Sequence, residues 1–327
     1  MRIRKKLILL VMLGAMVLAT ITVTNVTPAT AQATGTLAEI LARGYLIVGS
    51  DTTYPPFENM NETTGLAEGF DVDIAHQIAL DIGVNLVIQT SEWEPIIPNL
   101  KQKKFDMIIS AMTITAEREE EVDFSRWYYK SYQAILVPKG NPKSINSPSD
   151  LNMTDLRIGV QAGTTSFLWV QDNLDDNLID LLTYDTILLA IEALKNGQVD
   201  VVLGDYAVLA LDELESDETE VVGTYSPEDF GMAVREGDTD LLNAVNDALD
   251  DLLGSNLNNP NPSDLYNIIY YKWFGVSAGD VGYTGTVTTG TIPYAQVGAP
   301  VPGFELVTVF LALTIIPVVV ILRKKRK

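Results

Sequence analysis

Short β-prone runs and helical patterns alternate along most of residues 36–276, and few folds accommodate such a chain. The runs typical of strands are 46–49, 86–89, 106–110, 157–161 and 199–204. The helical patterns are 71–82, 94–101, 165–172, 186–196 and 206–215. Alternation of this kind predicts an α/β fold in which helices wrap parallel-type sheets. The chain of 327 residues is long enough for about two domains.

Composition excludes several classes of protein. The chain has no cysteine, and its one histidine, His76, leaves no multi-histidine metal site, so we expect neither a metal nor a cofactor. Most of the 43 Asp and Glu residues lie between the chain ends, whereas nine of the 22 Lys and Arg residues lie at those ends. The central part is therefore strongly acidic and repels polyphosphate, so we expect no nucleic-acid partner.

Both ends of the chain have the pattern of membrane-directed segments. Residues 1–33 combine a basic start, an apolar run and small residues near the end, which is typical of a signal peptide, with an uncleaved anchor as the alternative. Near the other end, an uncharged apolar run over 306–322 is followed by the basic residues 323–327. This pattern predicts a transmembrane segment with a cytoplasmic tail, and places everything between the two segments outside the cell.

A Gly-, Thr- and Pro-rich stretch, 277–302, precedes the second apolar run and predicts a flexible stalk. The motif Pro302-Gly303-Phe304 consists of the last residue of this stretch and the first two residues of the predicted anchor, 303–327. This motif resembles the C-terminal sorting signal of archaeal surface proteins, which a transpeptidase removes and replaces with lipid. Either this signal or a retained transmembrane helix would anchor the protein to the outer face of the cell membrane.

Polar and aromatic residues follow the first predicted strand, at the edge where α/β sheets bind ligands. Asp51 and Tyr54 come directly after this strand and precede two prolines. Asp51 would bind a cationic or amide group of a ligand, and the ring of Tyr54 would cover the apolar part of that ligand. The alternative is that Asp51 caps a turn and Tyr54 packs on the surface.

The loop after Ser110 carries Thr113 and leads into a helix that contains Arg118. A guanidinium fork and a hydroxyl group would together bind a carboxylate. The alternative is that Arg118 pairs with Glu117 or Glu121 within its own helix, where such a pair contributes about 0.3–0.5 kcal/mol.

Two further segments follow strands in the second half of the chain. Residues 163–166 open a helix, so they form either an anion site or a simple N-cap through Thr164 or Thr165. Asp205 is either the N-cap of the next helix or the partner of an ammonium group. Trp93 is either a core aromatic or a lid. Together these residues offer donors for a carboxylate, acids for an ammonium and aromatic faces, which are the groups that bind an α-amino acid.

A family resemblance extends over about 240 residues of the chain. It rests on five stretches that occur in the order typical of the family: 49–58, 69–79, 113–125, 159–164 and 204–205. The chain resembles the extracytoplasmic solute-binding proteins of polar amino-acid ABC transporters, of the family 3 type, which have the type II periplasmic-binding-protein fold. The resemblance implies these cleft residues: Asp51, Tyr54, Trp93, Ser110, Ala111, Met112, Thr113, Arg118, Gln161, Thr165, Ser166 and Asp205.

The resemblance also implies roles for these residues. Arg118 would bind the α-carboxylate of the ligand and Asp205 its α-ammonium, with neighbouring hydroxyl groups assisting. Asp51 would contact the polar end of the ligand side chain, while Tyr54 and Trp93 would enclose its stem. An acid at position 51 favours a basic or amide side chain.

Two lobes joined by two crossover strands, expected over 132–137 and 223–232, follow from the same resemblance. Lobe one would comprise 36–131 and 229–276, and lobe two 132–228. A monomeric protein of this kind closes around an amino acid and delivers it to an ABC permease with its ATPase, and it is not an enzyme. The alternatives are a periplasmic-binding-protein-like enzyme of the cyclohexadienyl dehydratase type and a sensory ectodomain.

Overall fold

The computed structural model describes residues 35–256 and 262–275. The predicted signal peptide, stalk and C-terminal membrane segment (1–33, 277–302 and 303–327) lie outside these residues. Among the helices of the two described ranges, none has the length and apolar character needed to cross a membrane.

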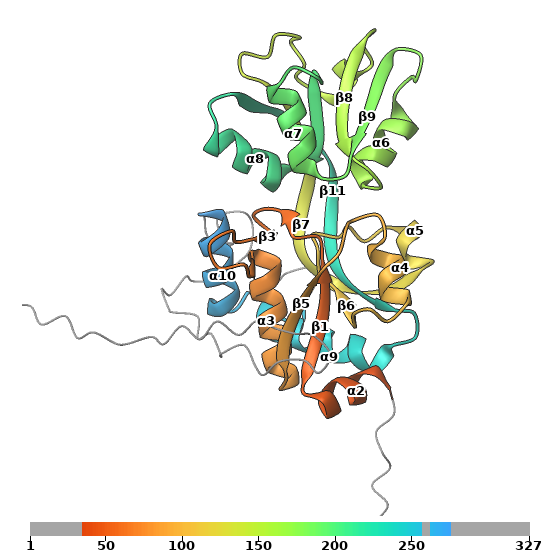
Figure 1. Ribbon diagram of the computed structural model, residues 1–327, viewed down its shortest axis with the longest axis vertical. Coiled ribbons are helices and arrows are strands. Elements are labelled where there is room, and N and C mark those ends of the chain that lie inside the picture. Colours follow the sequence, from red (N-terminus) through yellow and green to blue (C-terminus); the bar gives the residue numbers. More distant parts are fainter. Residues whose placement is uncertain (1–34, 257–261, 276–327) are drawn as a thin grey trace, which may run out of the picture.

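Two lobes stand one above the other in Figure 1, joined by the long strands β7 (Val122–Pro138) and β11 (Thr219–Arg235). These two strands pair antiparallel and run through both lobes. A single eight-stranded sheet therefore extends across the molecule, in the order β5-β1-β6-β11-β7-β10-β8-β9. The register of the β7–β11 pair shifts at several points, for example between Tyr225 and Pro227. Such irregularities bend and twist a strand pair where it passes between lobes.

Lobe one is built on parallel strands, as the sequence pattern predicts. Strand β1 (Tyr45–Ser50) pairs with β5 (Asn85–Thr90) and with β6 (Met107–Ile108), both in parallel. The helices of this lobe are α2 (Thr36–Arg43), α3 (Phe70–Ile82), α4 (Ile96–Lys101), α5 (Ala116–Glu119), α9 (Thr239–Leu253) and α10 (Asp264–Phe274). A small antiparallel sheet adds β2 (Thr53–Tyr54), β3 (Glu58–Met60) and β4 (Ala67–Glu68).

Lobe two repeats the parallel arrangement with fewer elements. Strand β8 (Leu156–Gln161) lies between β10 (Val201–Asp205) and β9 (Ile179–Tyr184) and is parallel to both. Its helices are α6 (Thr165–Asn173), α7 (Ile187–Lys195), α8 (Tyr206–Glu215) and the 3-10 turn η1 (Pro148–Leu151). Every residue of β10 is buried, which fits its nearly continuous apolar run. The strand ends at the rim of the lobe that faces lobe one.

One glycine in lobe one brings two segments into direct contact. Gly69 has a φ of 145°, and a Cβ at this position would lie 2.0 Å from the carbonyl oxygen of Phe57. The backbone N–H of Asp71 donates to the same oxygen at 2.9 Å. Because only glycine permits this approach, helix α3 begins directly against β3, the strand that starts at Glu58.

An aromatic cluster fixes the crossover strands inside lobe one. Tyr129 of β7 has its ring centre 5.0 Å from that of Phe57 and 5.6 Å from that of Phe230 on β11. Phe274 of α10 packs on the same tyrosine at 5.2 Å. Burial of large aromatic side chains is the dominant contribution to such a core. The clustered rings therefore hold β3 and α10 against both crossover strands.

Candidate functional site

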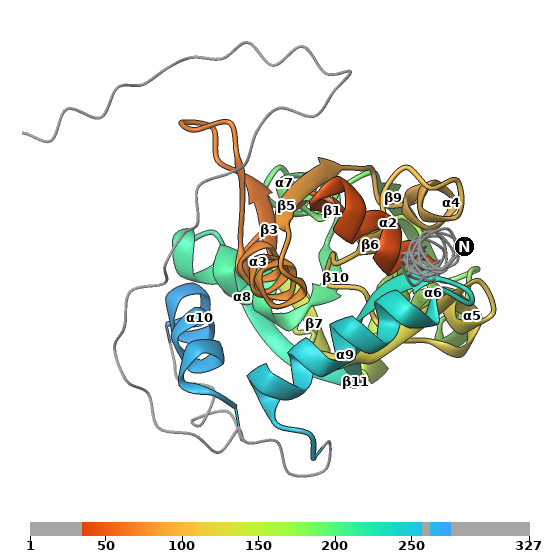
Figure 2. The same cartoon turned by 90° about the horizontal axis from the view of Figure 1, so that it is seen from below.

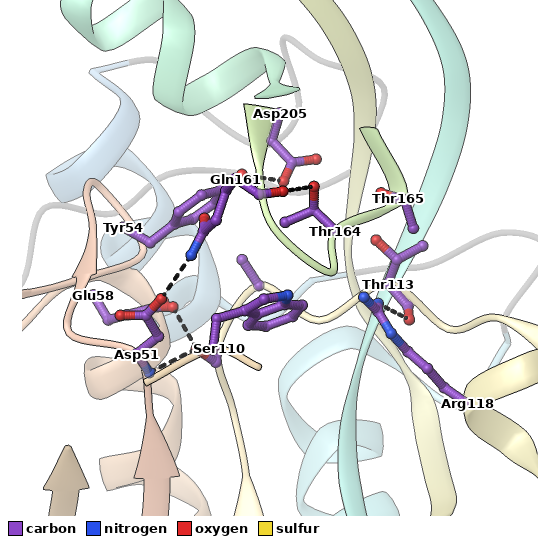
Figure 3. Close-up of a pocket in the computed structure, with 12 residues that line it drawn as sticks. Asp51, Tyr54, Glu58, Ser110, Thr113, Arg118, Gln161, Thr164, Thr165 and Asp205 are labelled. Atoms are coloured by element: carbon purple, nitrogen blue, oxygen red, sulfur yellow. Dashed lines mark hydrogen bonds between the residues drawn. The ribbon is translucent and has the colours of Figure 1, made fainter. Parts of the chain in front are cut away.

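A cavity with about 310 Å³ of open space lies where the two lobes meet. Its walls come from the loops that follow β1, β6, β8 and β10, which is where ligands bind in open α/β sheets (Figure 3). The lining residues are Asp51, Tyr54, Glu58, Trp93, Ser110, Ala111, Thr113, Arg118, Gln161, Thr164, Thr165 and Asp205.

Buried polar groups form the lobe-one wall around Asp51. The Asp51 backbone N–H donates to Ser110 Oγ at 2.9 Å, and this hydroxyl donates to Glu58 Oε1 at 2.7 Å. The hydroxyl of Thr53 donates to Asp51 Oδ1 at 2.7 Å. Burial raises the pKa of the Asp51 carboxyl, although the hydrogen bonds from Thr53 and Gln161 oppose this shift.

Arg118 is the cation that lines the same cavity. Thr115 caps the short helix α5, and the Arg118 guanidinium reaches back to donate to the carbonyl oxygen of Thr113 at 2.8 Å. It lies over the Trp93 ring, 5.1 Å from the ring centre. Burial lowers the pKa of Arg118, while nearby acids, Glu228 first among them, oppose that shift. Among the described residues, Arg118 forms a salt bridge with neither Glu117 nor Glu121, and Glu121 pairs with Lys101 instead.

Asp205 presents a buried carboxyl group from lobe two. It ends strand β10 and is 6% exposed. Its oxygens accept from Tyr54 Oη at 2.6 Å and from Gln133 Nε2 at 3.0 Å. Burial, with the neighbouring Glu228 charge, raises the pKa of Asp205 to about 8. Asp205 occupies the N-cap position of helix α8, but its side chain makes no capping hydrogen bond to that helix and is directed to the cavity partners instead.

Three hydrogen bonds join the lobes across the cavity, and we refer to them as the cross-lobe bonds. Tyr54 Oη donates to Asp205 Oδ2 at 2.6 Å. Gln161 Nε2 donates to Asp51 Oδ2 at 3.0 Å. Trp93 Nε1 donates to the carbonyl oxygen of Gly163 at 3.0 Å. Because each bond pairs a side chain of one lobe with an acceptor of the other, the structure represents a closed arrangement.

Two polar residues of the crossover strands, Gln133 and Glu228, lie behind the cavity wall. Glu228 of β11 accepts from Thr113 Oγ1 at 2.7 Å and from Gln133 Nε2 at 3.0 Å. Gln133 of β7 therefore bridges Glu228 and Asp205. This chain of hydrogen bonds links the arginine side of the cavity to its acidic side through both crossover strands.

Most of the predicted residues meet at this cavity. Those that line it are Asp51, Tyr54, Trp93, Ser110, Ala111, Thr113, Arg118, Gln161, Thr165 and Asp205. Met112 does not, because its side chain is fully buried in a core cluster with Ile96 and Leu100. Ser166 does not either, because it is buried and its hydroxyl donates to Gln133 Oε1.

Four residues of the site were not predicted. Glu58 and Thr164 line the cavity, and Gln133 and Glu228 support it from behind. Thr164 caps helix α6, accepting from the N–H of Phe167 at 3.3 Å, so the capping alternative for this segment holds. A lone polar residue directly before the apolar run 134–137 was a usable signal for Gln133. Glu58 and Glu228 had no such signal, since acids are ordinarily solvated.

The described residues contain no group of three or more His, Asp or Glu side chains arranged to hold a metal ion. The groups that converge are one guanidinium, several carboxyls, hydroxyls and two aromatic rings. Such a set binds a small zwitterion: its carboxylate meets the guanidinium and its ammonium meets an acid.

Residues 46–276 match the family described as bacterial extracellular solute-binding proteins, family 3. The chain is 33% identical to the L-cystine-binding protein TcyJ of Escherichia coli K12 over 243 residues, which is 74% of this chain and 86% of that protein.

Solved structures show the same architecture. A mutant of ArgBP from T. maritima aligns with a TM-score of 0.66 and 36% identity, covering 73% of this chain and 99% of that one. An ancestral amino acid-binding protein, AncCDT-1, described as a precursor of cyclohexadienyl dehydratase, aligns with the same TM-score, identity and coverage. Both alignments support a two-lobed periplasmic-binding-protein fold.

Proposed function

The chain belongs to the bacterial extracellular solute-binding proteins of family 3, and from this membership we propose that it binds a polar L-amino acid for an ABC importer. Relatives of this chain are amino-acid-binding proteins of ABC transporters, with ligands that include cystine, arginine and glutamine. The residues of this chain act as a receptor and supply no chemical step.

The observation that carries the proposal is the opposition of charges across one cavity. Arg118 stands on the lobe-one wall, and Asp205 stands on the lobe-two wall. Within the part of the chain that the structure describes, the guanidinium donates one hydrogen bond to protein, to Thr113 O, and so retains N–H groups for a carboxylate. In the proposed complex Arg118 binds the α-carboxylate, with Thr113 and Thr165 nearby, and Asp205 binds the α-ammonium with Ser110.

The side chain of the ligand would extend toward Asp51 and Gln161. These two residues already contact each other across the lobes, at 3.0 Å between Nε2 and Oδ2. An inserted cation or amide would replace this contact with its own hydrogen bonds to both residues. Tyr54 and Trp93 would lie along its apolar stem. We therefore propose a basic or amide side chain, as in arginine, lysine or glutamine.

Closure of the lobes would be the signal that the permease reads. The site has residues on both lobes, so the ligand contacts all of them only when the lobes are closed. We propose lobe one as 36–131 with 229–276, lobe two as 132–228, and a monomer in the extracytoplasmic space. Anchoring to the outer face of the membrane through residues 303–327 is part of the same proposal.

Thermal-shift screening of the twenty common L-amino acids tests this function. We expect a rise in melting temperature with basic or amide amino acids and none with their D-enantiomers. The same mixtures, analysed by mass spectrometry after incubation, should contain the amino acid unchanged. If no amino acid raises the melting temperature, the proposal is refuted. If a product appears, the protein is an enzyme and not only a binding protein.

A further inference from the structure

Two fully buried acids, Glu58 and Asp71, lie together beneath the lobe-one wall of the cavity. Asp71 Oδ2 accepts from the backbone N–H of Ala111 at 2.7 Å and from Tyr128 Oη at 2.7 Å. Glu58 Oε1 accepts from Ser110 Oγ at 2.7 Å. Neither acid forms a salt bridge within the described ranges of the chain.

Each of the two carboxyls has a second oxygen that takes no part in the hydrogen bonds described above. Glu58 Oε2 and Asp71 Oδ1 are buried and receive no N–H or O–H donor from other described residues. The two side chains are nevertheless within hydrogen-bonding reach of each other. Ionised carboxylates only accept hydrogen bonds, so a bond between these two carboxyl groups requires a proton on one of them. Two charges at such close range in a dry environment would repel strongly.

We propose that Glu58 and Asp71 share one proton and act as a positioning pair for Ser110 and Ala111 in the ligand site. The inference rests on the proposed function of that site. Because Ser110 donates its one hydroxyl proton to Glu58, its oxygen turns only lone pairs toward the cavity. A hydroxyl in this state accepts from an ammonium and does not donate to a carboxylate. The pair thus sets which end of a zwitterion lies at Ser110.

The backbone at Ala111 depends on the same pair. Ala111 has a φ of 44°, in the left-handed region that is unfavourable for residues with a Cβ. Its N–H donates to Asp71 Oδ2, which holds the turn in place. This turn directs Ala111 toward the cavity and Met112 into the core. Asp71 therefore shapes a wall that it does not itself line.

The sign of the pH dependence follows from the surroundings of the pair. The other titratable groups that face it are Asp51, from the loop after β1, and Tyr128, from β7. Burial raises the pKa of Asp71 to about 7 and raises that of Glu58 well above its ordinary value. In the unfolded chain both acids titrate near pH 4. The stability contributed by the shared proton is therefore complete below about pH 4 and is lost as pH rises toward about 7.

Thermal unfolding of the ligand-free full chain between pH 4 and pH 8 tests the shared proton. In Glu58→Gln and Asp71→Asn, an amide N–H replaces the shared proton. The melting temperature of each variant should therefore fall less between pH 4 and pH 7 than that of the wild type. Glu62→Gln, at an exposed position of the same hairpin, is the matched control and should keep the wild-type decline.

The double variant distinguishes the shared proton from ordinary packing. With amides at both positions, the carbonyl oxygens stay with the donors Ser110, Ala111 and Tyr128, so the two NH2 groups face each other without an acceptor. The melting temperature of the double variant should therefore fall by more than the sum of the decreases in the two single variants. Additive single changes, or amide variants that retain the full wild-type pH decline, would overturn the shared proton.

A binding cycle tests the action through Ser110, with the twenty common L-amino acids as probes. Ser110→Ala and Glu58→Met should each weaken binding about tenfold, and the double variant should bind no more weakly than the weaker single variant. Additive losses would show that Glu58 does not act through Ser110. If the wild-type chain binds none of these amino acids, the proposed function fails, and the thermal experiment still decides whether the proton is shared.

Discussion

The two lobes meet the cavity with walls of different construction. In lobe one, polar groups are bonded within the lobe: the Asp51 N–H to Ser110, and Ser110 to Glu58. In lobe two, Asp205 is bonded to Tyr54 of lobe one and to Gln133 of a crossover strand. Ser110 and Glu58 in the lobe-one wall therefore have their partners within lobe one, whereas Asp205 in the lobe-two wall gains Tyr54 as a partner through closure. Changes in lobe one should affect binding directly, and changes in lobe two should affect closure as well.

The largest effect is expected from Arg118→Ala in lobe one. Removal of the guanidinium would leave the ligand carboxylate unpaired in a desolvated cavity, which costs about 3–5 kcal/mol. Affinity should fall at least about a hundredfold, at 1.4 kcal/mol per factor of ten. Isothermal titration calorimetry measures this change, with Lys101→Ala, on the nearby helix α4, as the control. Unchanged affinity would remove Arg118 from the site.

Asp205→Asn should weaken binding by about tenfold to a hundredfold. The amide retains a hydrogen bond with Tyr54 but loses the charge that pairs with the ammonium of the ligand. Titration calorimetry with the ligand found by screening provides the affinity, and small-angle scattering shows whether the variant still closes on ligand. A variant that binds as tightly as the wild type would contradict the role of lobe two in ammonium recognition.

Affinity should also depend on pH through Asp205. Since its pKa is raised to about 8, the carboxyl carries a proton at neutral pH and must release it to pair with an ammonium. Below about pH 8, each unit of falling pH should weaken binding by up to about tenfold. Calorimetry in buffers of different ionisation enthalpy detects the released proton. Equal affinity at pH 6 and pH 8 would contradict this expectation, and Asp205→Asn should abolish the dependence.

The smallest effect is expected from Trp93→Phe. This change removes the cross-lobe bond to the Gly163 carbonyl, and one such hydrogen bond contributes about 1 kcal/mol net. The ratio of closed to open protein should fall about fivefold, because 1.4 kcal/mol corresponds to tenfold. Small-angle scattering of the ligand-free protein measures the change. Trp169→Phe, in which the replaced indole packs at a tilt against Tyr225 of β11, is the control and should leave the scattering curve unchanged.

The sequence predicts the sheets and most of the cavity because both depend on local pattern. Asp51, Ser110, Gln161 and Asp205 all lie at strand ends, and parallel strands bring their carboxyl ends to the same edge. Their convergence therefore follows from strand order alone. The crossover strands are longer than the ranges expected for them, 132–137 and 223–232, because their flanks carry polar residues that interrupt the apolar pattern.

What the sequence does not predict depends on distant partners. From the sequence alone, Asp71 is an acid in the first turn of a helix, where it would only stabilise the start of that helix. In the structure this side chain bonds to Ala111, 40 positions away, and to Tyr128, 57 positions away. Met112 was expected at the cavity but is buried in a core cluster; it follows Ala111, whose φ is positive, and nothing in the residue type of an alanine signals such a backbone.

Both ends of the described chain belong to lobe one, which contains helix α2 at one end and helix α10 at the other. Figure 2, seen from below, shows the two helices with α3 and α9 in this lobe. Within the described residues, lobe two therefore contains neither end of the chain. Fluorophores attached near residues 36 and 275 would both lie on lobe one, so the distance between them would not change on closure. An optical sensor built from this protein needs one dye on lobe two, for which Leu188 of α7, 43% exposed, is a suitable attachment point.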